Sequence, residues 1–437
     1  MADLDNLLSR LGGEEALSAS ARAHGAFRRA REVKTATALL RLVLMYGPGG
    51  LSLRTAAAVA AEGGLCDISD VALLKRIRHA AAWLEALCAE QIGLADAAPG
   101  DVAGAINLVD ASVIKSPGTG TDYRLHLRWD VTRQRSVAAR ITTTAVGERL
   151  DLLCGTATGI LIGDRGYPQP DGLRNTLDSG AEVLVRLTWN SLSLTGRDDQ
   201  PLDWLALCAQ AHRAGSVDIP VLVRKAHRRF EPLPMRLVFI PKPAEAAATA
   251  RKAAERASRK AQRKQVDPRT LACADHLILL TSLPPARFNL AQLGALYRLC
   301  WQIELLFKRL KSLLHLDRLP AKDPALAQAW LHAHLLIALL AEDCIADKEA
   351  FPPSAGPRRR DAGFARSDPS GLDLALIRHG GARHPRCGAP DTAIQPDHSL
   401  PPPSPTPRAA ATAAVAGGRI LKLAPMGLGP AIHDWRC

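Results

Sequence analysis

The chain has 437 residues, which is enough for two or three domains that each bury a hydrophobic core. Apolar residues make up 47% of it, so a fully disordered chain is excluded. Lysine and arginine outnumber aspartate and glutamate by 56 to 43, which gives a formal net charge of +13. This charge favours a polyanionic partner such as nucleic acid, although a GC-rich genome that enriches arginine and alanine would produce the same balance.

The cysteines and the apolar segments exclude further classes of protein. The nine cysteines are scattered and form no Cys-x-x-Cys pair, so we expect buried thiols in a reducing cytosol rather than a zinc or redox centre. The N-terminus, MADLDNLLSRLGGEE, is acidic and lacks the apolar run of a signal peptide. The longest apolar stretch, residues 329–341, is too short to span a bilayer. We therefore expect a cytoplasmic protein that does not associate with membranes.

The first hundred residues are predicted to be helical. Apolar residues recur at helical spacing in LLRLVLMYG and again in VALLKRIRHAAAWLEAL, and the turn sequences GPGG and EGG lie between them. An alanine-rich helix, a turn at Gly63 and Gly64, and a second, basic helix capped by Ser69 follow the order of a helix-turn-helix. Because any helical hairpin shares this order, DNA binding and a plain hairpin both stay open.

The pattern changes to strands at residue 106. Segments rich in β-branched residues predict the strands of a sheet: INLVD, YRLHLRWDV, SVAARITTTAV, TGILIGD, EVLVRLTW, IPVLVR, MRLVFI and HLILLTS. Residues 251–264 interrupt them with seven basic residues and one acidic residue. This stretch is either a solvated helix or a contact to the DNA backbone.

Two helices and a tail complete the chain. Apolar periodicity predicts a helix from Leu290 to Leu314 and a second from about Pro324 to Ala341. Residues 349–437 are rich in proline, arginine and alanine and lack the apolar period that a core needs. We expect a disordered tail there, and a frameshift would produce a similar sequence.

Two aspartates end apolar, strand-like segments. Asp110 closes INLVD and Asp164 closes GILIGD. At the end of a buried strand, a carboxylate can face solvent and bind a metal ion, and carboxylates are the ligands that Mg²⁺ and Mn²⁺ prefer. A single aspartate in this position is more often a turn or cap residue, so each one alone is a weak indication.

The segment YRLCWQIELLFKRLK carries a stronger pattern. Positions 297, 300, 304, 308 and 311 are three or four residues apart, so their side chains share one face of a helix. A solvated charged stripe explains the glutamate and the lysines on this face. It does not explain Tyr297.

Taken together, these segments resemble the insertion-sequence 4 family of DDE transposases. The helix is similar to the Tyr-Arg-Glu-Lys signature of that family, which is spaced Tyr-x2-Arg-x3-Glu-x6-Lys. The blocks VDAS, DYRLHL and GDRGY resemble the family's sequences around its first and second aspartates, and SLRTAAAVAA with ISDVALLKRI resembles its N-terminal domain. The resemblance covers roughly residues 20–345.

The resemblance implies a catalytic site and its cofactor. Asp110, Asp164 and Glu304 are expected to form a metal-binding triad for two Mg²⁺ ions, with Mn²⁺ as a substitute. Six other residues are expected to contact DNA near the cleaved end or to support the site: Tyr297, Lys308, Lys311 and, more weakly, Arg124, His126 and Arg165.

The resemblance also implies the fold, which is an RNase H-like α/β core with a β-rich insertion, preceded by an all-helical DNA-binding domain. The expected boundaries are 1–100 for the helical domain, 101–189 and 276–348 for the two parts of the core, 190–275 for the insertion with its basic helix, and 349–437 for the tail.

The implied activity is that of a bacterial, nucleoid-associated transposase. It cleaves double-stranded DNA at the terminal repeats of an element and joins the freed 3′-hydroxyl to its partner strand or to target DNA. Since two ends must be brought together, a homodimer in the DNA complex is expected. Two alternatives stay open: a decayed transposase that only binds DNA, and another RNase H-like nuclease such as a junction resolvase.

Cys300 departs from the signature, because the family has an arginine at this position. Arg298 lies two residues away and therefore points to another face of the helix. Either the missing guanidinium weakens the grip on a phosphate, so that Cys300→Arg would raise cleavage, or Cys300 packs in the core and another arginine grips the phosphate.

Overall fold

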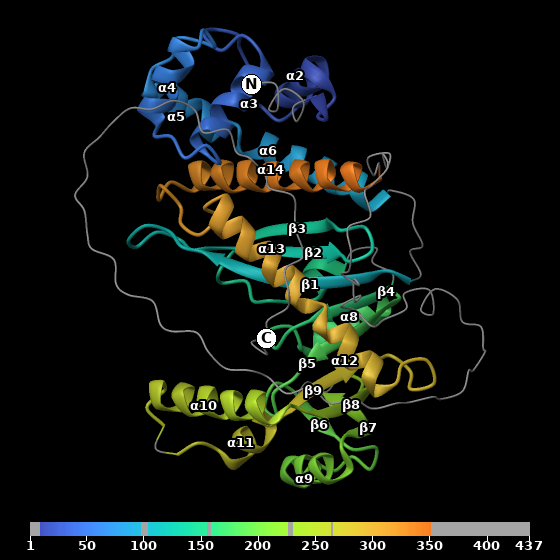
Figure 1. Ribbon diagram of the computed structural model, residues 1–437. Coiled ribbons are helices and arrows are strands. Elements are labelled where there is room, and N and C mark those ends of the chain that lie inside the picture. Colours follow the sequence, from blue (N-terminus) through green and yellow to red (C-terminus); the bar gives the residue numbers. More distant parts are fainter. Residues whose placement is uncertain (1–8, 98–103, 155–158, 226–229, 264, 351–437) are drawn as a thin grey trace, which may run out of the picture. The chain divides into compact units, whose positions relative to one another are not determined.

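One mixed sheet of nine strands organises the chain (Figure 1). The computed structural model describes residues 9–97, 104–154, 159–225, 230–263 and 265–350. The strands are β1 (Ile106–Ile114), β2 (Tyr123–Asp130), β3 (Arg135–Thr143), β4 (Gly159–Gly163), β5 (Ala181–Arg186), β6 (Ser193–Thr195), β7 (Val217–Arg224), β8 (Leu233–Pro241) and β9 (His276–Thr281). All except β6 match strands predicted from β-branched segments. β6 has only three residues, too few for a pattern to show.

The strands have the order β3-β2-β1-β4-β5-β9-β8-β7-β6. β1, β4 and β5 are parallel neighbours, and the other neighbouring strands are antiparallel. A parallel pair needs a crossover, which the helix α8 (Pro170–Asp178) supplies between β4 and β5. The strands β6 to β8, expected in an insertion, continue the same sheet through β9.

Helices cover both faces of this sheet. They are α2 (Gly13–Ala23), α3 (Ala36–Tyr46), α4 (Leu53–Glu62), α5 (Asp70–His79), α6 (Ala81–Ala97), α7 (Asp151–Cys154), α8, α9 (Trp204–Ala214), α10 (Ala244–Lys260), α11 (Pro268–Ala274), α12 (Leu290–Arg298), α13 (Cys300–Leu313) and α14 (Pro324–Ala350). The helix predicted over 290–314 is thus two helices, which meet at Leu299. α14 begins where predicted and continues beyond residue 341.

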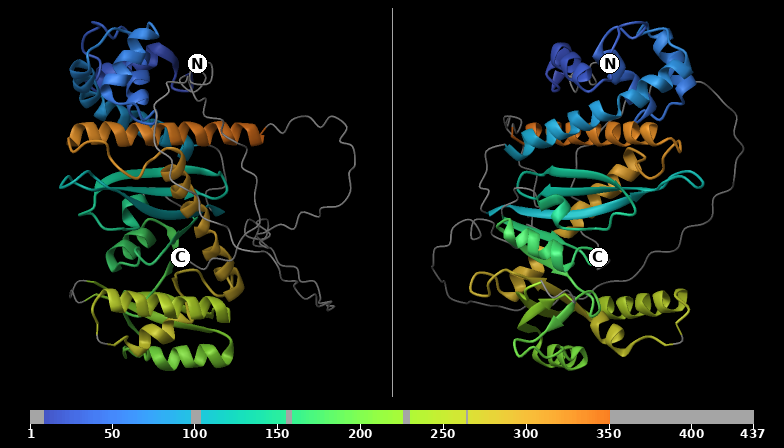
Figure 2. Two further views of the ribbon diagram at one scale, coloured as in Figure 1. Left: turned by 60° about the vertical axis from the view of Figure 1, so that its left-hand side comes forward. Right: turned by 180° about the vertical axis from the view of Figure 1, so that it is seen from behind.

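The N-terminal helices contact the sheet mainly through α6 and α14. These two helices lie side by side against β3 (Figures 1 and 2). α14 also contacts α3 and α5, and Arg78 of α5 forms an ion pair of 2.9 Å with Asp323. The predicted cap of α5 is confirmed, because the Ser69 hydroxyl accepts a hydrogen bond from the backbone N–H of Ala72 at 3.3 Å.

Alternation along β1 assigns its side chains to two hydrophobic cores. Ile106 and Leu108 belong to the core that includes residues of α12, α13, α14 and the N-terminal helices. Val109 belongs to the core that includes residues of α8, α9 and α11. Each fully buried side chain of this kind stabilises the fold by about 1.5–3 kcal/mol. By the same alternation, Asp110 faces the side that α13 covers.

α14 is the one described helix long and apolar enough to span a membrane, over Pro324–Ile345. However, 72% of its apolar window is buried inside the protein. Its composition is therefore explained by packing in the core. The predicted tail at 349–437 falls outside the described residues, apart from the last two residues of α14.

Candidate active site

Asp110 and Asp164 lie at the same level of two neighbouring parallel strands. Val109 of β1 is aligned with Gly163 of β4, and each aspartate is the next residue. The structure corrects one detail, because β1 does not end at Asp110 but continues to Ile114, paired there with β2 alone. Asp110 therefore stands where β1 separates from β4. Since paired strands are about 4.8 Å apart, the two aspartates emerge side by side.

Several negative charges converge on Asp110. Burial is the main cause that raises the pKa of Asp110 to about 7, and the charges of Asp164, Glu148 and Glu304 raise it further. A hydrogen bond of 2.8 Å from the Ala111 N–H to Asp110 Oδ1 acts in the opposite direction. Asp110 is thus a carboxyl group whose ionised form needs a nearby positive charge.

Glu304 reaches this site from α13. Buried Ile303, Phe307 and Leu310 hold one side of the helix in the core, and α13 contacts β1. The Glu304 side chain is exposed, as a residue on the other side of an amphipathic helix should be. Figure 1 shows α13 running across the face of the sheet over β1.

The chemistry of these donors fits a divalent cation. Carboxylate oxygens are the hard ligands that Mg²⁺ prefers, and a bound cation would offset both the burial and the repulsion that raise the pKa of Asp110. In this conformation, no three His, Cys, Asp or Glu side chains of the described residues are placed to hold a metal ion together. Cation binding would therefore have to draw the carboxylates inward, and Glu304 is the exposed one of the three.

The residues of the predicted signature divide between the core and the surface. Tyr297 and Cys300 are buried, with 4% and 5% of their surface exposed, and both pack in the core beneath α12 and α13. Lys308 is exposed, Lys311 is half-buried, and Arg298 is exposed. Only the two lysines and Arg298 can therefore meet DNA without a rearrangement.

The weaker candidates divide in a similar way. Arg165 is exposed and follows Asp164 directly. On β2, Leu127 is aligned with Asp110, so Arg124 and His126 point to the opposite face of the sheet. His126 is fully buried, its Nε2 lies 2.9 Å from Thr142 Oγ1, and burial lowers its pKa to about 4. A buried, neutral imidazole supports the sheet and offers DNA no charge.

The structure brings in two residues that the sequence pattern did not single out, Glu148 and Tyr167. Glu148 lies in the loop before α7, where no spacing or strand pattern marks it. Tyr167 belongs to the block GDRGY, but its role was not apparent there. Burial and the charges of Asp110, Glu148 and Asp164 raise the pKa of the Tyr167 phenol.

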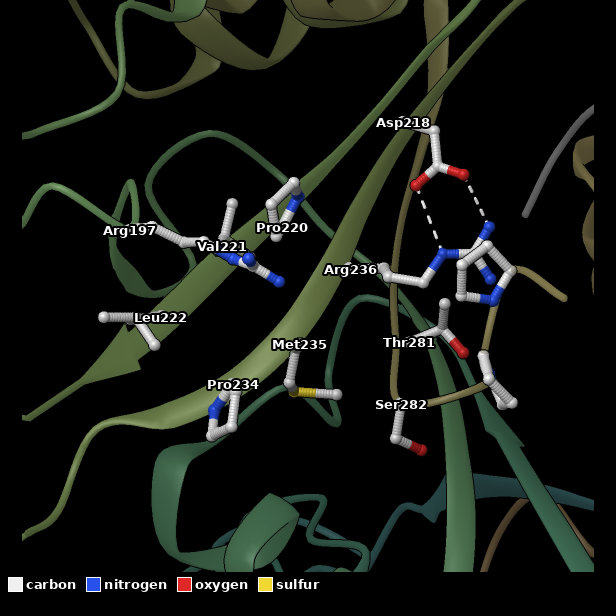
Figure 3. A pocket seen from close by; sticks show the side chains of 12 residues that line it. Arg197, Asp218, Pro220, Val221, Leu222, Pro234, Met235, Arg236, Thr281 and Ser282 are labelled. Atoms are coloured by element: carbon white, nitrogen blue, oxygen red, sulfur yellow. Dashed lines mark hydrogen bonds and ion pairs between the residues drawn. The ribbon is translucent and has the colours of Figure 1, made fainter.

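A separate pocket lies on β7, β8 and the end of β9 (Figure 3). Its lining includes Asp218 and Arg236, which bond to each other, with Arg236 Nε donating to Asp218 Oδ1 at 3.2 Å. Arg236 is further bound to the carbonyl oxygens of Leu283 and Phe288. Because its charged pair is already satisfied, this pocket is a weaker candidate for catalysis than the carboxylates.

Comparisons with known proteins identify the family of the chain. Residues 105–340 match the family described as Transposase DDE domain, and this span contains Asp110, Asp164 and Glu304. The chain is 38% identical over 361 residues to the putative transposase InsL for insertion sequence element IS186A of Escherichia coli strain K12, an alignment that covers 81% of this chain and 97% of the relative. It is also 38% identical over 362 residues to the transposase for insertion sequence element IS421 of Escherichia coli, with the same coverage.

Proposed function

Since this chain belongs to the transposase DDE domain family and acts in DNA transposition, we propose that Asp110, Asp164 and Glu304 are the carboxylates with which it cuts and rejoins DNA. The observation that carries this assignment is the position of Asp110. It stands where β1 leaves β4, beside Asp164, and the charge of Glu304 on α13 contributes to its raised pKa. Such strongly perturbed carboxyl groups concentrate at functional sites.

The three carboxylates would hold divalent metal ions, and we propose two Mg²⁺ ions with Mn²⁺ as a substitute. When bound, the ions supply charge stabilisation at the phosphate and an activated oxygen nucleophile. Asp164 is oriented for this by the Gly166 N–H, which donates to its Oδ1 at 2.8 Å. Asp110 is fixed by the strand, whereas Glu304 can adjust from its exposed helix face.

The proposed reaction has two steps. Water attacks the phosphorus at the element end, the P–O3′ bond breaks, and a 3′-hydroxyl is released. That hydroxyl then attacks a second phosphodiester, so that one P–O bond forms as another breaks. The residues of the chain bind and orient the strands during both steps.

We assign the surface around the carboxylates to DNA. Lys308, Lys311 and Arg165 would pair with backbone phosphates, while Tyr297 and Arg124 would support the site from within the fold. The helices of residues 1–100 form the proposed DNA-binding domain. Within the family, the closest assignment we propose is the insertion-sequence 4 group with its Tyr-Arg-Glu-Lys signature.

We further propose that the strands β3-β2-β1-β4-β5 with α13 form an RNase H-like core, made of residues 101–189 and 276–348, and that residues 190–275 are its insertion. The enzyme would act as a homodimer on double-stranded DNA of the terminal repeats and the target. It would work in the bacterial cytoplasm, on the nucleoid.

End cleavage tests the catalytic assignment. The full chain is incubated with the terminal repeats that flank its own gene, with Mg²⁺, Mn²⁺ or EDTA. We expect nicked and strand-transfer products only with a divalent cation, and none from Asp110→Asn, Asp164→Asn or Glu304→Gln. Cleavage by any of these variants at the wild-type rate would contradict the role of that carboxylate. DNA binding without products in the wild type would favour a transposase that has lost catalysis.

A further inference from the structure

A fourth carboxylate, that of Glu148, lies beside the proposed catalytic site. Burial and the charge of Asp164 raise the pKa of Glu148, and the charge of Glu148 in turn raises the pKa of Asp110. Glu148 also fills the space over Gly166, because its Oε2 is 1.8 Å from the position that a Cβ atom would take there. Gly166 is the residue whose N–H binds Asp164, so Glu148 lies within the same turn as the second aspartate.

Contacts from two residues, Gln169 and Arg124, hold the loop that carries Glu148. Gln169 Nε2 donates to the backbone carbonyl of Glu148 at 2.8 Å. Arg124 donates through Nη1 to the backbone carbonyl of Val146, and its Nε lies 3.9 Å from Glu148 Oε1. These contacts hold the backbone around Glu148 beside the site, and its half-buried carboxylate lies next to Arg124.

Tyr167 gives an independent indication that the site of Asp110, Asp164 and Glu148 takes a ligand. Its side chain has no exposed surface, and its hydroxyl has no hydrogen-bond partner among the residues that the structure describes. The ring packs on Gly163, the last residue of β4, and the charges of Asp110, Glu148 and Asp164 all act on the phenol. A buried hydroxyl is rarely left without a partner in a folded protein. An oxygen atom of a bound ligand or of its hydration shell would supply the partner.

We propose that Glu148 is a fourth carboxylate of the proposed cation-binding site. The proposal rests on the assignment of Asp110, Asp164 and Glu304 as the catalytic carboxylates. Arg124 offsets only part of the negative charge of Glu148, and a divalent cation offsets much more. An additional hard oxygen ligand also suits Mg²⁺ or Mn²⁺, which take up to six such ligands or waters.

Mn²⁺ binding by the full chain tests the proposal without any need for activity. Free Mn²⁺ is measured by electron paramagnetic resonance during a titration in the absence of DNA. We expect Glu148→Gln to weaken Mn²⁺ binding about tenfold, the lower end of what supporting groups contribute at metal sites. The matched control is Glu182→Gln, which removes a half-buried carboxylate at the start of β5, aligned with Ile160 at the far end of β4. The control should bind Mn²⁺ like the wild type.

Asp110→Asn separates failure of this proposal from failure of the catalytic assignment. Weaker binding in Asp110→Asn together with wild-type affinity in Glu148→Gln would overturn the role of Glu148 alone. Wild-type affinity in Asp110→Asn would overturn the catalytic assignment. Equal weakening of Mn²⁺ binding in Glu148→Gln and Glu182→Gln would also overturn the proposal. Such a result would mean that binding responds to the net charge of the protein and not to the position of Glu148.

A second variant keeps the test decisive if Glu148→Gln fails to fold, as judged by thermal melting without cation. Glu148→Asp keeps the charge and shortens the side chain by one methylene group. Weaker Mn²⁺ binding in Glu148→Asp supports a ligand role, since a ligand must reach its ion. Unchanged binding overturns it.

Discussion

Gly163 allows the Tyr167 ring to pack directly against the end of β4, next to Asp164. A Cβ atom at Gly163 would meet ring and Cβ atoms of Tyr167 at 3.0–3.1 Å, closer than van der Waals contact allows. Tyr167 is fully buried, so its ring has no free space to move into. The end of β4 is thus shaped by the absence of a side chain.

We therefore expect Gly163→Ala to lower the free energy of unfolding by about 1–3 kcal/mol, the usual effect of overpacking a core. Cleavage of end DNA should fall as well, because Asp164 is the next residue. Chemical denaturation and the cleavage assay measure the two effects. Gly93→Ala is the control, since a Cβ atom there meets nothing within 4 Å and alanine favours the helix. Unchanged stability in Gly163→Ala would mean that the Tyr167 ring moves aside at little cost.

The burial of Cys300 favours one of the two interpretations that the sequence left open. Its side chain is 5% exposed and packs in the core beneath α13. This burial favours the interpretation that Cys300 is a core residue over the interpretation that a missing arginine weakens binding of a phosphate. Cys300→Arg should then destabilise the fold by about 1–3 kcal/mol and leave end cleavage no faster per folded molecule. Thermal melting and single-turnover cleavage check both parts. Faster cleavage at unchanged stability would support the interpretation that the missing arginine limits this enzyme.

Glu148 illustrates what a single sequence does not contain. Asp110 and Asp164 were predicted because each ends an apolar, strand-like segment of the sequence, and Glu304 because it shares a helical face with Lys308; the family resemblance joined the three. Glu148 follows no periodic element, and only the folded loop brings it to Gly166. The burial of Tyr297 was equally hidden, because helical spacing shows which residues share a face but not what that face packs against.

At the scale of elements, the order of strands and helices could be predicted, and the details of their pairing could not. Strong runs of β-branched residues marked eight strands in their observed order. The continuation of β1 to Ile114 was missed because Asp110 interrupts its apolar pattern. The break at Leu299 was missed because apolar spacing continues across it, and both sides of the break remain helical. Pairing of β9 with β5 depends on contacts nearly a hundred residues apart, which local patterns do not encode.

The contact between α14 and β3 gives a test of stability against pH. The Glu342 carboxylate accepts hydrogen bonds from the Ser136 N–H at 2.7 Å and from the Ser136 hydroxyl at 3.0 Å. Burial nevertheless raises the pKa of Glu342 from 4.5 to about 7, with a smaller effect from the charge of Asp343. The folded protein therefore keeps a proton that the unfolded chain loses as the pH rises.

This difference has a definite sign. Between pH 4.5 and about 7 the contribution of Glu342 to stability should fall as the pH rises, and above that range it should be constant. The total loss is at most about 3 kcal/mol. Glu342→Gln should remove this part of the pH dependence and should be more stable relative to wild type at pH 8 than at pH 5. Denaturation curves at both pH values measure it, and parallel pH profiles of the two proteins would contradict the raised pKa.

At the scale of the whole molecule, the chain has a net charge of +13, and basic residues are concentrated on some of the described elements. α10 carries exposed Arg256, Arg259 and Lys260, and α13 carries Lys308 and Lys311 near the proposed site. Many other basic side chains are already paired, as Lys225 is with Asp171. The lysines of α13 are therefore better placed than the average basic residue to bind phosphate.

The salt dependence of DNA binding separates phosphate contacts from solvated lysines. Each phosphate that a lysine neutralises releases counterions and contributes about 0.9 to the slope of log K against log salt concentration. We expect Lys308→Ala and Lys311→Ala each to weaken binding of end DNA and to reduce that slope by about 0.9. Lys225→Ala is the matched control, because it removes the same charge from an exposed lysine that pairs with Asp171 and lies directly after the end of β7. Fluorescence anisotropy at several salt concentrations measures all three. If Lys308→Ala and Lys311→Ala keep the wild-type slope, these two lysines stay solvated in the complex. The positive charge that binds DNA would then lie elsewhere on the chain.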